Sequence, residues 1–330
     1  MWNFLMAWEI ISRKRATWIL IKDLRIVYEE AGLVVLNKHP NLLINDVHPW
    51  FHCVTLQMQL FFNRPHYANW DLENMFHFVN RLDYATSGLI CIACDRFTAH
   101  ILGKTFTKRM VGKQYLALVW GHVDLKSVSR NPEVVCQVRP NVYLVQMALG
   151  TIDHLWPCGR MQKLVAPATD VRSRNIRNCS TIVVVLEHGC ILGEPASHLL
   201  LIPQSGRRHQ LRVHCAAGLG HPIVGDLSYS PWPFISQPRE LVHDTSLDYQ
   251  LDRMMLHAYR LNLVIRSQRE RALIHHQHDR KAFLRDSLTD KHQVLDLCAS
   301  DPEFFSESEH TWIPETKLHN LSDWQDIFTL

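Results

Sequence analysis

Short, uninterrupted apolar runs constrain the fold of this chain more than any other feature of its sequence. Three of them have the length of single strands: Leu116–Trp120, Thr181–Leu186 and Leu199–Pro203. The side chains of a strand alternate between the two faces of its sheet, so a run without polar alternation is typical of a strand buried on both faces. The three runs therefore predict three buried strands.

Other segments supply the elements around these strands. Residues 26–37 have a strand, turn, strand pattern, and apolar residues at helical spacing predict an amphipathic helix over 95–109 with Asp95 as its cap. A short helix fits between His209 and Gly220, and another strand fits Met255–Ile265. Strands interleaved with fewer, shorter helices predict a mixed-sheet α/β or α+β domain from about Leu24 to Ile265.

The 330 residues allow one large domain with appendages or two modest domains. We expect an N-terminal extension over 1–23, a main domain over 24–265, and a partly mobile C-terminal appendage over 266–330. The appendage is rich in charges and histidines, with Val294–Leu297 and Trp312 as the residues that would pack back. The irregular stretch Lys126–Asn178 is predicted to hold long loops.

Composition indicates an ordinary globular protein, with 47% hydrophobic and 20% charged residues. The nine cysteines are odd in number and have no framework spacing, which favours reduced thiols in an intracellular compartment, cytoplasmic or nuclear. Met1–Ile21 is apolar but broken by three basic residues, so it is too short to span a bilayer and no membrane association is expected. Because the segment is poor in acidic residues, a mitochondrial presequence is the alternative.

The formal net charge of +3 neither demands nor excludes nucleic acid, but the basic residues cluster. The clusters comprise Lys104, Lys108, Arg109 and Lys113; Arg172, Arg174 and Arg177; and Arg207, Arg208 and Arg212. A solvated helix face or loop would account equally well for any one of them.

The segment Asn80–Gly88, with the sequence NRLDYATSG, places Asp83 before a Thr-Ser-Gly turn. Nearby hydroxyls and amides can hold a carboxylate there at the mouth of a sheet. Taken alone, an aspartate in this position is also typical of a turn or a cap.

The segment Ser205–His214, with the sequence SGRRHQLRVH, is densely polar at a strand-to-helix junction. Such a junction presents free amides to phosphate. Arg212 follows Leu211 on the short helix, so it can point inward while Arg207 and Arg208 point to solvent. An inward arginine needs an anion, and Asp83 is our candidate for it. A basic surface loop is the competing interpretation.

The segment Lys113–Gly121, with the sequence KQYLALVWG, places Tyr115 at the start of a buried strand. Its ring can be fixed by packing while its hydroxyl is aimed at a cleft. Tyrosines at strand starts are also commonly just packed.

Together the three segments resemble the RluA-type pseudouridine synthases, and in particular the branch of RNA pseudouridylate synthase domain-containing proteins. That family's motifs read HRLDxxTSG, KxYxAxVxG, and TGRxHQLRxH followed by GHPIxGD, and they occur here in the same order. Leu219–Asp226, with the sequence LGHPIVGD, matches the last of them. The resemblance covers about residues 24–265. Asn80 replaces the usual histidine, Ser205 replaces threonine, and Lys38-His39 stands where many members have Lys-Pro, and these departures bear on fine substrate preference.

The resemblance implies an α+β catalytic domain whose mixed, largely antiparallel central sheet is flanked by helices and loops. It implies isomerisation of uridine to pseudouridine in RNA after base flipping, with no cofactor and no metal. By this resemblance Asp83 is the catalytic nucleophile, Arg212 pairs with it, and Tyr115 lines the pocket against the flipped base. The residues expected to contact RNA are Arg81, Lys113, Arg207, Arg208 and His209. Transfer, ribosomal or messenger RNA would be the partner, and no obligatory protein partner is expected.

Two other interpretations stay open. A metal enzyme could use the pair Cys91 and Cys94 or the cluster His275, His276 and His278, although the cysteines fit strand packing better and a zinc site there needs two more ligands. A catalytically silent relative could bind RNA as a scaffold or chaperone. The intact Asp83, Tyr115 and Arg212 argue against it.

Overall fold

The computed structural model describes residues 24–30, 32–44, 54, 76–128, 133–155, 161–230, 244–266, 292–300, 302, 312–324 and 327. The chain divides into two compact units. The larger unit comprises 1–7, 114–257 and 301–330, and the smaller unit comprises 8–113 and 258–300. The division falls inside two strands, β5 (Val111–Trp120) and β13 (Leu256–Arg266).

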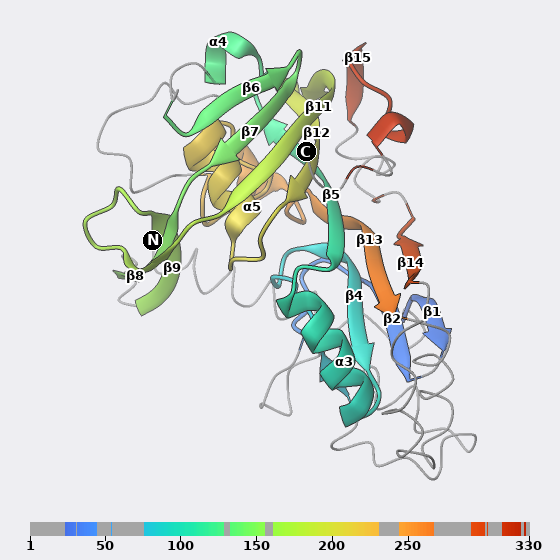
Figure 1. The fold of residues 1–330 in the computed structure, drawn as a ribbon. Helices are drawn as coiled ribbons and strands as arrows, with labels where there is room; N and C mark the ends of the chain where they lie inside the picture. Colours follow the sequence, from blue (N-terminus) through green and yellow to red (C-terminus); the bar gives the residue numbers. More distant parts are fainter. Residues whose placement is uncertain are drawn as a thin grey trace. The chain divides into compact units, whose positions relative to one another are not determined.

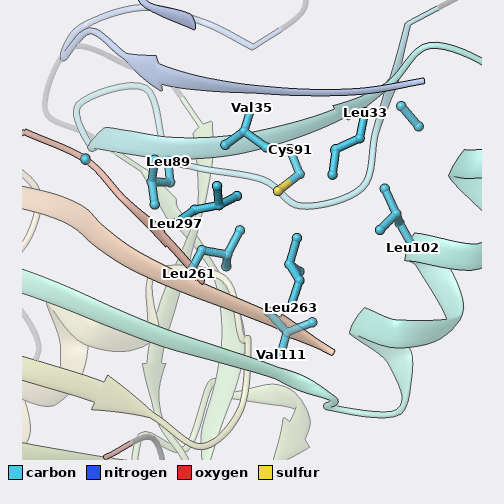
Figure 2. Packing of buried hydrophobic residues seen from close by; sticks show 11 residues of the cluster. Leu33, Val35, Leu89, Cys91, Leu102, Val111, Leu261, Leu263 and Leu297 are labelled. Carbon is cyan, nitrogen blue, oxygen red and sulfur yellow. The ribbon is translucent and has the colours of Figure 1, made fainter. Parts of the chain in front are cut away.

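The smaller unit is built on the strands β1 (Ile26–Glu30), β2 (Leu33–Lys38), β3 (His77–Phe78) and β4 (Ser87–Ala93) together with β13 and β14 (His292–Cys298). Neighbouring strands run in the order β1-β2-β4-β13, and β14 pairs with β13. β1 and β2 confirm the predicted strand, turn, strand pattern. Every side chain of β2 and β4 is buried, and Figure 2 shows the Cys91 sulfur among apolar side chains of β2, β13 and β14.

The helix α3 (Arg96–Thr107) covers this core and confirms the predicted amphipathic helix. Asp95 is its N-cap: the carboxylate accepts hydrogen bonds from the backbone nitrogens of Phe97 and Thr98, both at 2.8 Å. An N-cap carboxylate satisfies amides that have no partner inside the helix. Leu102 is buried on the inner face of the helix (Figure 2).

The larger unit is built on an antiparallel sheet in the order β5-β12-β11-β7-β6. Its other strands are β12 (Glu194–Pro203), β11 (Ser180–Ile191), β7 (Val142–Gln146) and β6 (Val135–Arg139). In Figure 1, β7, β11 and β12 lie side by side. The three apolar runs are the buried parts of β5, β11 and β12, as predicted. The fold class is therefore confirmed as α+β, with a mixed, largely antiparallel central sheet and few helices.

The long loops predicted for Lys126–Asn178 are wrong. This region holds β6, β7 and a second antiparallel sheet in the order β10-β8-β9, made of β8 (Leu149–Leu155), β9 (Met161–Pro167) and β10 (Arg174–Arg177). All four side chains of β10 are exposed, and so are four of the five in β6. Strands of this kind lack the apolar pattern by which a strand is recognised.

The predicted short helix after His209 consists of α5 (Gln210–Val213) followed by the π-helical turn η3 (His214–Leu219), and Gly220 ends it with φ 82°. The two turns pack through Val213, Ala216 and Ala217 against the second sheet, where Leu149 and Val165 belong to the same apolar cluster. Arg212 is thereby carried on a buried helical segment.

The C-terminal part of the chain contributes β15 (Ile313–Lys317), which pairs with β11, and the 3-10 turn η7 (Leu321–Trp324). Trp312 is buried in an apolar cluster of the larger unit, and Leu297 is buried in the smaller one, so both residues pack as expected. The domain boundaries after residues 23 and 265 stay a prediction, and residues 1–23 lie outside the described ranges. Among the described residues, no helix is long and apolar enough to cross a membrane.

Candidate active site

In the smaller unit, Asp83 lies on the turn that leads into β4. Its side chain is half-buried, and its backbone carbonyl accepts a hydrogen bond from the Thr86 nitrogen at 3.2 Å. The turn ends at Gly88, whose φ is +104°, and a Cβ atom there would lie 2.3 Å from the Ala258 carbonyl oxygen. Only glycine fits this conformation and this approach. The glycine of the Thr-Ser-Gly part of the motif is therefore explained by the backbone path that follows Asp83.

Lys38 holds the same turn in place through hydrogen bonds. Its side chain is 2% exposed, and its ammonium donates to the backbone oxygens of His39 at 2.7 Å, Leu42 at 2.9 Å and Tyr84 at 3.1 Å. A buried ammonium with three acceptors joins the segment after β2 to the residue next to Asp83. Sequence reasoning noted Lys38 only as a motif match. The sequence alone does not reveal that Lys38 is buried, because a lysine at a strand end normally reaches solvent.

Asn80, which stands where the family usually has histidine, is bonded to β4. Its Oδ1 accepts from the Cys91 nitrogen at 2.7 Å, so the side chain anchors the beginning of the Asp83 segment. Arg81, between Asn80 and the buried Leu82, is exposed.

In the larger unit, Arg212 points inward as predicted, and its carboxylate partner there is Asp226. The guanidinium Nε donates to Oδ2 and Nη2 donates to Oδ1, both at 2.7 Å. Arg212 is 7% exposed and Asp226 1%. A bidentate pair fixes the plane of the guanidinium as well as its position. The expected pairing of Arg212 with Asp83 concerns residues of two different units, and it stays a prediction.

The loop that carries Asp226 is fixed by a second buried carboxylate. Gly225 has φ +77°, and a Cβ atom there would lie 2.2 Å from the Arg253 carbonyl oxygen. The Gly225 nitrogen donates to Asp248 at 2.6 Å, the Trp120 indole donates to the same oxygen at 2.8 Å, and the Ser230 hydroxyl donates to the other one. Asp248 thus ties the loop to the end of β5. Its position in the chain gives no hint of this contact.

Tyr229 and His209 complete the surroundings of Arg212. The fully buried Tyr229 ring lies 4.8 Å from the Arg212 guanidinium carbon, and its hydroxyl lies 2.7 Å from His209 Nδ1. His209 has the left-handed backbone (φ 51°) that starts α5. Left-handed backbone costs a non-glycine residue roughly 1–2 kcal/mol. The Tyr229 contact helps to hold that conformation, so Tyr229 supports both Arg212 and the basic loop.

The basic loop 205–209 is held from inside by Gln210. The side-chain oxygen of Gln210 accepts from the Ser205 hydroxyl at 2.8 Å and from the Arg207 nitrogen at 3.1 Å, while its amide donates to the Ser180 carbonyl at 3.0 Å. Ser205 therefore provides the hydroxyl expected of threonine at its position. Arg207 and Arg208 are exposed, as predicted.

His214, the last residue of the motif, is buried and neutral. Burial lowers its pKa to about 4, although the Met147 carbonyl at 3.3 Å from Nε2 opposes part of that shift. Its Nδ1 lies 2.9 Å from the Thr181 hydroxyl. His214 thus joins η3 to β11 and to Met147, the residue that follows β7, and its role is packing and hydrogen bonding.

Tyr115 is half-buried in β5, where it pairs in register with Leu201 of β12. Lys113, two residues earlier and in the smaller unit, is half-buried as well. Burial lowers the pKa of Lys113, and the charge of Arg109 lowers it further. Among the predicted site residues, the larger unit holds Tyr115, Arg207, Arg208, His209 and Arg212, and the smaller unit holds Arg81, Asp83 and Lys113.

Cys91 and Cys94 take part in strand packing. Cys91 pairs in register with Val35 inside the sheet, and burial strongly raises its pKa. Burial raises the pKa of Cys94 to about 12, with smaller contributions from Asp95 and Glu29. The described part of the chain contains no group of three or more potential metal ligands, and His275, His276 and His278 lie outside it.

Comparisons with known proteins identify the family of the chain. A family profile described as RNA pseudouridylate synthase matches residues 32–217. The mouse (Mus musculus) RNA pseudouridylate synthase domain-containing protein 1 is 37% identical over 252 residues, which are 76% of this chain and 72% of the mouse protein. The dual-specificity RNA pseudouridine synthase RluA of Escherichia coli (strain K12) is 29% identical over 239 residues, which are 72% of this chain and 90% of RluA.

Similarity extends to the fold. The solved structure of human RNA pseudouridylate synthase domain containing 1 superposes with a TM-score of 0.62 at 27% identity, covering 92% of this chain and 94% of the human one. On sequence and on fold, this chain belongs to the RluA-type branch of the RNA pseudouridylate synthase family, a family of isomerases.

Proposed function

We propose that this chain converts uridine to pseudouridine within RNA, with Asp83 as the nucleophile. The reaction breaks the N1–C1′ bond, turns the uracil and joins C5 to C1′. The proton lost from C5 is balanced by one gained at N1, so the product is an isomer of the substrate. The chemistry needs a group that stabilises the sugar while the base is detached, and a pocket that retains the base.

The observation that carries the proposal is the way the Asp83 turn is built. Lys38 and Gly88 fix its backbone from two sides, and the carboxylate is half-buried at the start of a fully buried strand. A rigid turn holds a reacting carboxylate within the narrow limits that catalysis requires. An aspartate that merely served a turn would not need a buried lysine beneath it.

Arg212 and Tyr115 are proposed as the partners of Asp83. An arginine near the carboxylate favours its ionised form and so keeps the nucleophile active at neutral pH. Asp226 supports this role, because its bidentate contact fixes the guanidinium plane. Tyr115 would line the pocket against the uracil and assist the proton transfer that completes the product.

Uracil is inaccessible inside a stacked helix, so we propose that the nucleotide is flipped out, at a cost of a few kcal/mol. Arg81, which is exposed and two residues before Asp83, would fill the gap left in the RNA. Lys113, Arg207, Arg208 and His209 would contact phosphates, with an affinity that falls as salt rises.

The direct test is an assay of the product. Purified protein is incubated with RNA transcribed from labelled UTP, the RNA is digested to nucleosides, and the C-glycoside isomer is separated by chromatography. Formation of the isomer without any added cofactor supports the proposal. RNA binding without product, across transfer, ribosomal and messenger RNA, would instead identify a silent RNA-binding scaffold.

RNA as substrate also implies an intracellular site of action, cytoplasmic or nuclear. The acid-poor segment Met1–Ile21 makes the mitochondrion the alternative. Imaging of the tagged protein, combined with pseudouridine mapping in cells with and without it, identifies the compartment and the modified RNA together.

A further inference from the structure

The edge strand β10 and the turn before it form a basic exposed stretch of the larger unit. Arg172, Arg174 and Arg177 fall within six residues, and all three side chains are exposed. Among the described strands β10 pairs with β8 alone, with Arg174 opposite Thr151 and Arg177 opposite Leu149. The charges therefore lie along a free sheet edge, outside the motifs that define the candidate active site.

The three arginines differ in their partners. Arg172 is neutralised locally, because its guanidinium makes two hydrogen bonds to the Asp170 carboxylate, at 2.9 and 2.6 Å. Within the described part of the chain, neither Arg174 nor Arg177 has a carboxylate partner. Two positive charges along this edge are thus left for an external anion. A bulge separates them, and their partners Thr151 and Leu149 are two residues apart on β8, so the backbones of Arg174 and Arg177 are roughly 7 Å apart.

This edge is continuous with the basic loop 205–209. The Gln210 side chain bonds both the Arg207 nitrogen, at 3.1 Å, and the Ser180 carbonyl, at 3.0 Å, and Ser180 is three residues after Arg177. The charge of Arg207 also reaches Cys179, where it opposes part of the rise that burial causes in the thiol pKa, to about 11. The hydrogen bonds of Gln210 therefore place the loop close to the residues that follow β10.

We infer that Arg174 and Arg177 bind backbone phosphates of the RNA strand that flanks the reacting uridine. The inference rests on RNA as the substrate and extends the contact surface from the loop 205–209 along β10. RNA fits this edge because phosphates are spaced along a strand and need no shape-specific pocket. The competing explanation is that charges on an edge strand only prevent pairing with other sheets.

The test compares two double variants that lose the same charge. Arg174→Gln/Arg177→Gln is matched by Lys126→Gln/Lys317→Gln, which changes two exposed lysines elsewhere in the larger unit. Binding of a fluorescein-labelled 30-nucleotide RNA hairpin is measured by anisotropy over a series of KCl concentrations. The arginine variant should weaken binding on the order of tenfold and reduce the log Kd against log salt slope by about 1 per lost contact, while the lysine variant changes neither.

A second probe separates this surface from the catalytic site. A short oligouridine that covers only the reacting nucleotide and its neighbours should bind the wild-type protein and the arginine variant equally well. With the hairpin as substrate, KM should rise and kcat should stay unchanged. Equal effects of the two double variants, or an unchanged salt slope, would overturn the inference. Because binding is measured directly, this outcome is distinct from a failure to form pseudouridine.

Discussion

Arg212 and Asp226 form a bidentate ion pair in which both side chains are buried. Breaking one half of such a pair leaves an uncompensated charge inside the protein, which costs about 3–5 kcal/mol. Asp226→Asn should therefore lower the midpoint of urea unfolding strongly, while Asp323→Asn, on the exposed side of η7, should not. The double variant Arg212→Met/Asp226→Leu should regain most of the stability without regaining activity. Equal midpoints for Asp226→Asn and the wild-type protein would contradict the pair.

Asp83→Asn should lower the rate of pseudouridine formation by ~10³-fold or more, because an amide cannot act as the nucleophile. RNA binding should be retained, since the change removes a negative charge facing a polyanion. Asp95→Asn is the matched control. It makes the same chemical change in the same unit, and asparagine serves as well as aspartate at a helix N-cap. Turnover by Asp83→Asn close to that of the control would show that the nucleophile is misassigned.

Lys38→Met should destabilise the smaller unit by about 3 kcal/mol, because three backbone oxygens, one buried and two partly buried, lose their donor. At low denaturant, where the protein stays folded, kcat should also fall, since the turn that carries Asp83 loses its anchor. Lys104→Met, on the exposed side of α3, is the control and should change neither quantity. Urea unfolding and the product assay at 20 °C measure the two effects. A stable, fully active Lys38→Met protein would refute the positioning role.

His214 should make stability depend on pH. Its pKa is lowered by burial from 6.5 in the unfolded chain to about 4 in the folded protein, so between these values the unfolded state binds the extra proton. The stabilising contribution is therefore complete above pH 6.5, falls as the pH is lowered, and is lost near pH 4, with a total of ~3 kcal/mol. Urea midpoints at pH 7, 6 and 5 should converge between the wild-type protein and His214→Gln. If the urea midpoints of the two proteins instead fell in parallel as the pH is lowered, a group other than His214 would cause the loss of stability.

Gln114 links β5 to the C-terminal segment. Its buried amide donates to the Trp324 carbonyl at 2.7 Å and to the Ile327 carbonyl at 2.9 Å. Gln114→Leu and removal of residues 319–330 should each lower stability by about 1–3 kcal/mol, and the combined variant should lose less than the sum because both changes break the same contact. Strict additivity in urea unfolding would argue that the contact contributes nothing.

Several elements were predictable because the sequence contains their physical cause. The apolar runs in β5, β11 and β12 are buried, the Asp95 cap starts α3, and Gly220 ends η3. β6 and β10 escaped prediction because their exposed side chains carry no apolar period. Their existence depends on pairing with neighbours that are distant in sequence or follow a turn.

The site was predictable in its residue types but not in all its partners. The inward orientation of Arg212 followed from its place beside Leu211, whereas its pairing with Asp226 depends on how the loop after η3 returns to β5. Asp248 and Lys38 act through burial, which no local pattern reveals. Carboxylates and lysines that hold a site in place are thus harder to find from sequence than the groups that react.

The contacts of Gln114 with Trp324 and Ile327 join positions 210 and 213 residues apart. Ribosomes add roughly 5–20 residues per second, so about 10–40 s pass between the synthesis of the two sides. During that interval the amide of Gln114 cannot yet have these acceptors, although β5 is already made. Completion of the larger unit must therefore wait for translation to reach the segment around η7.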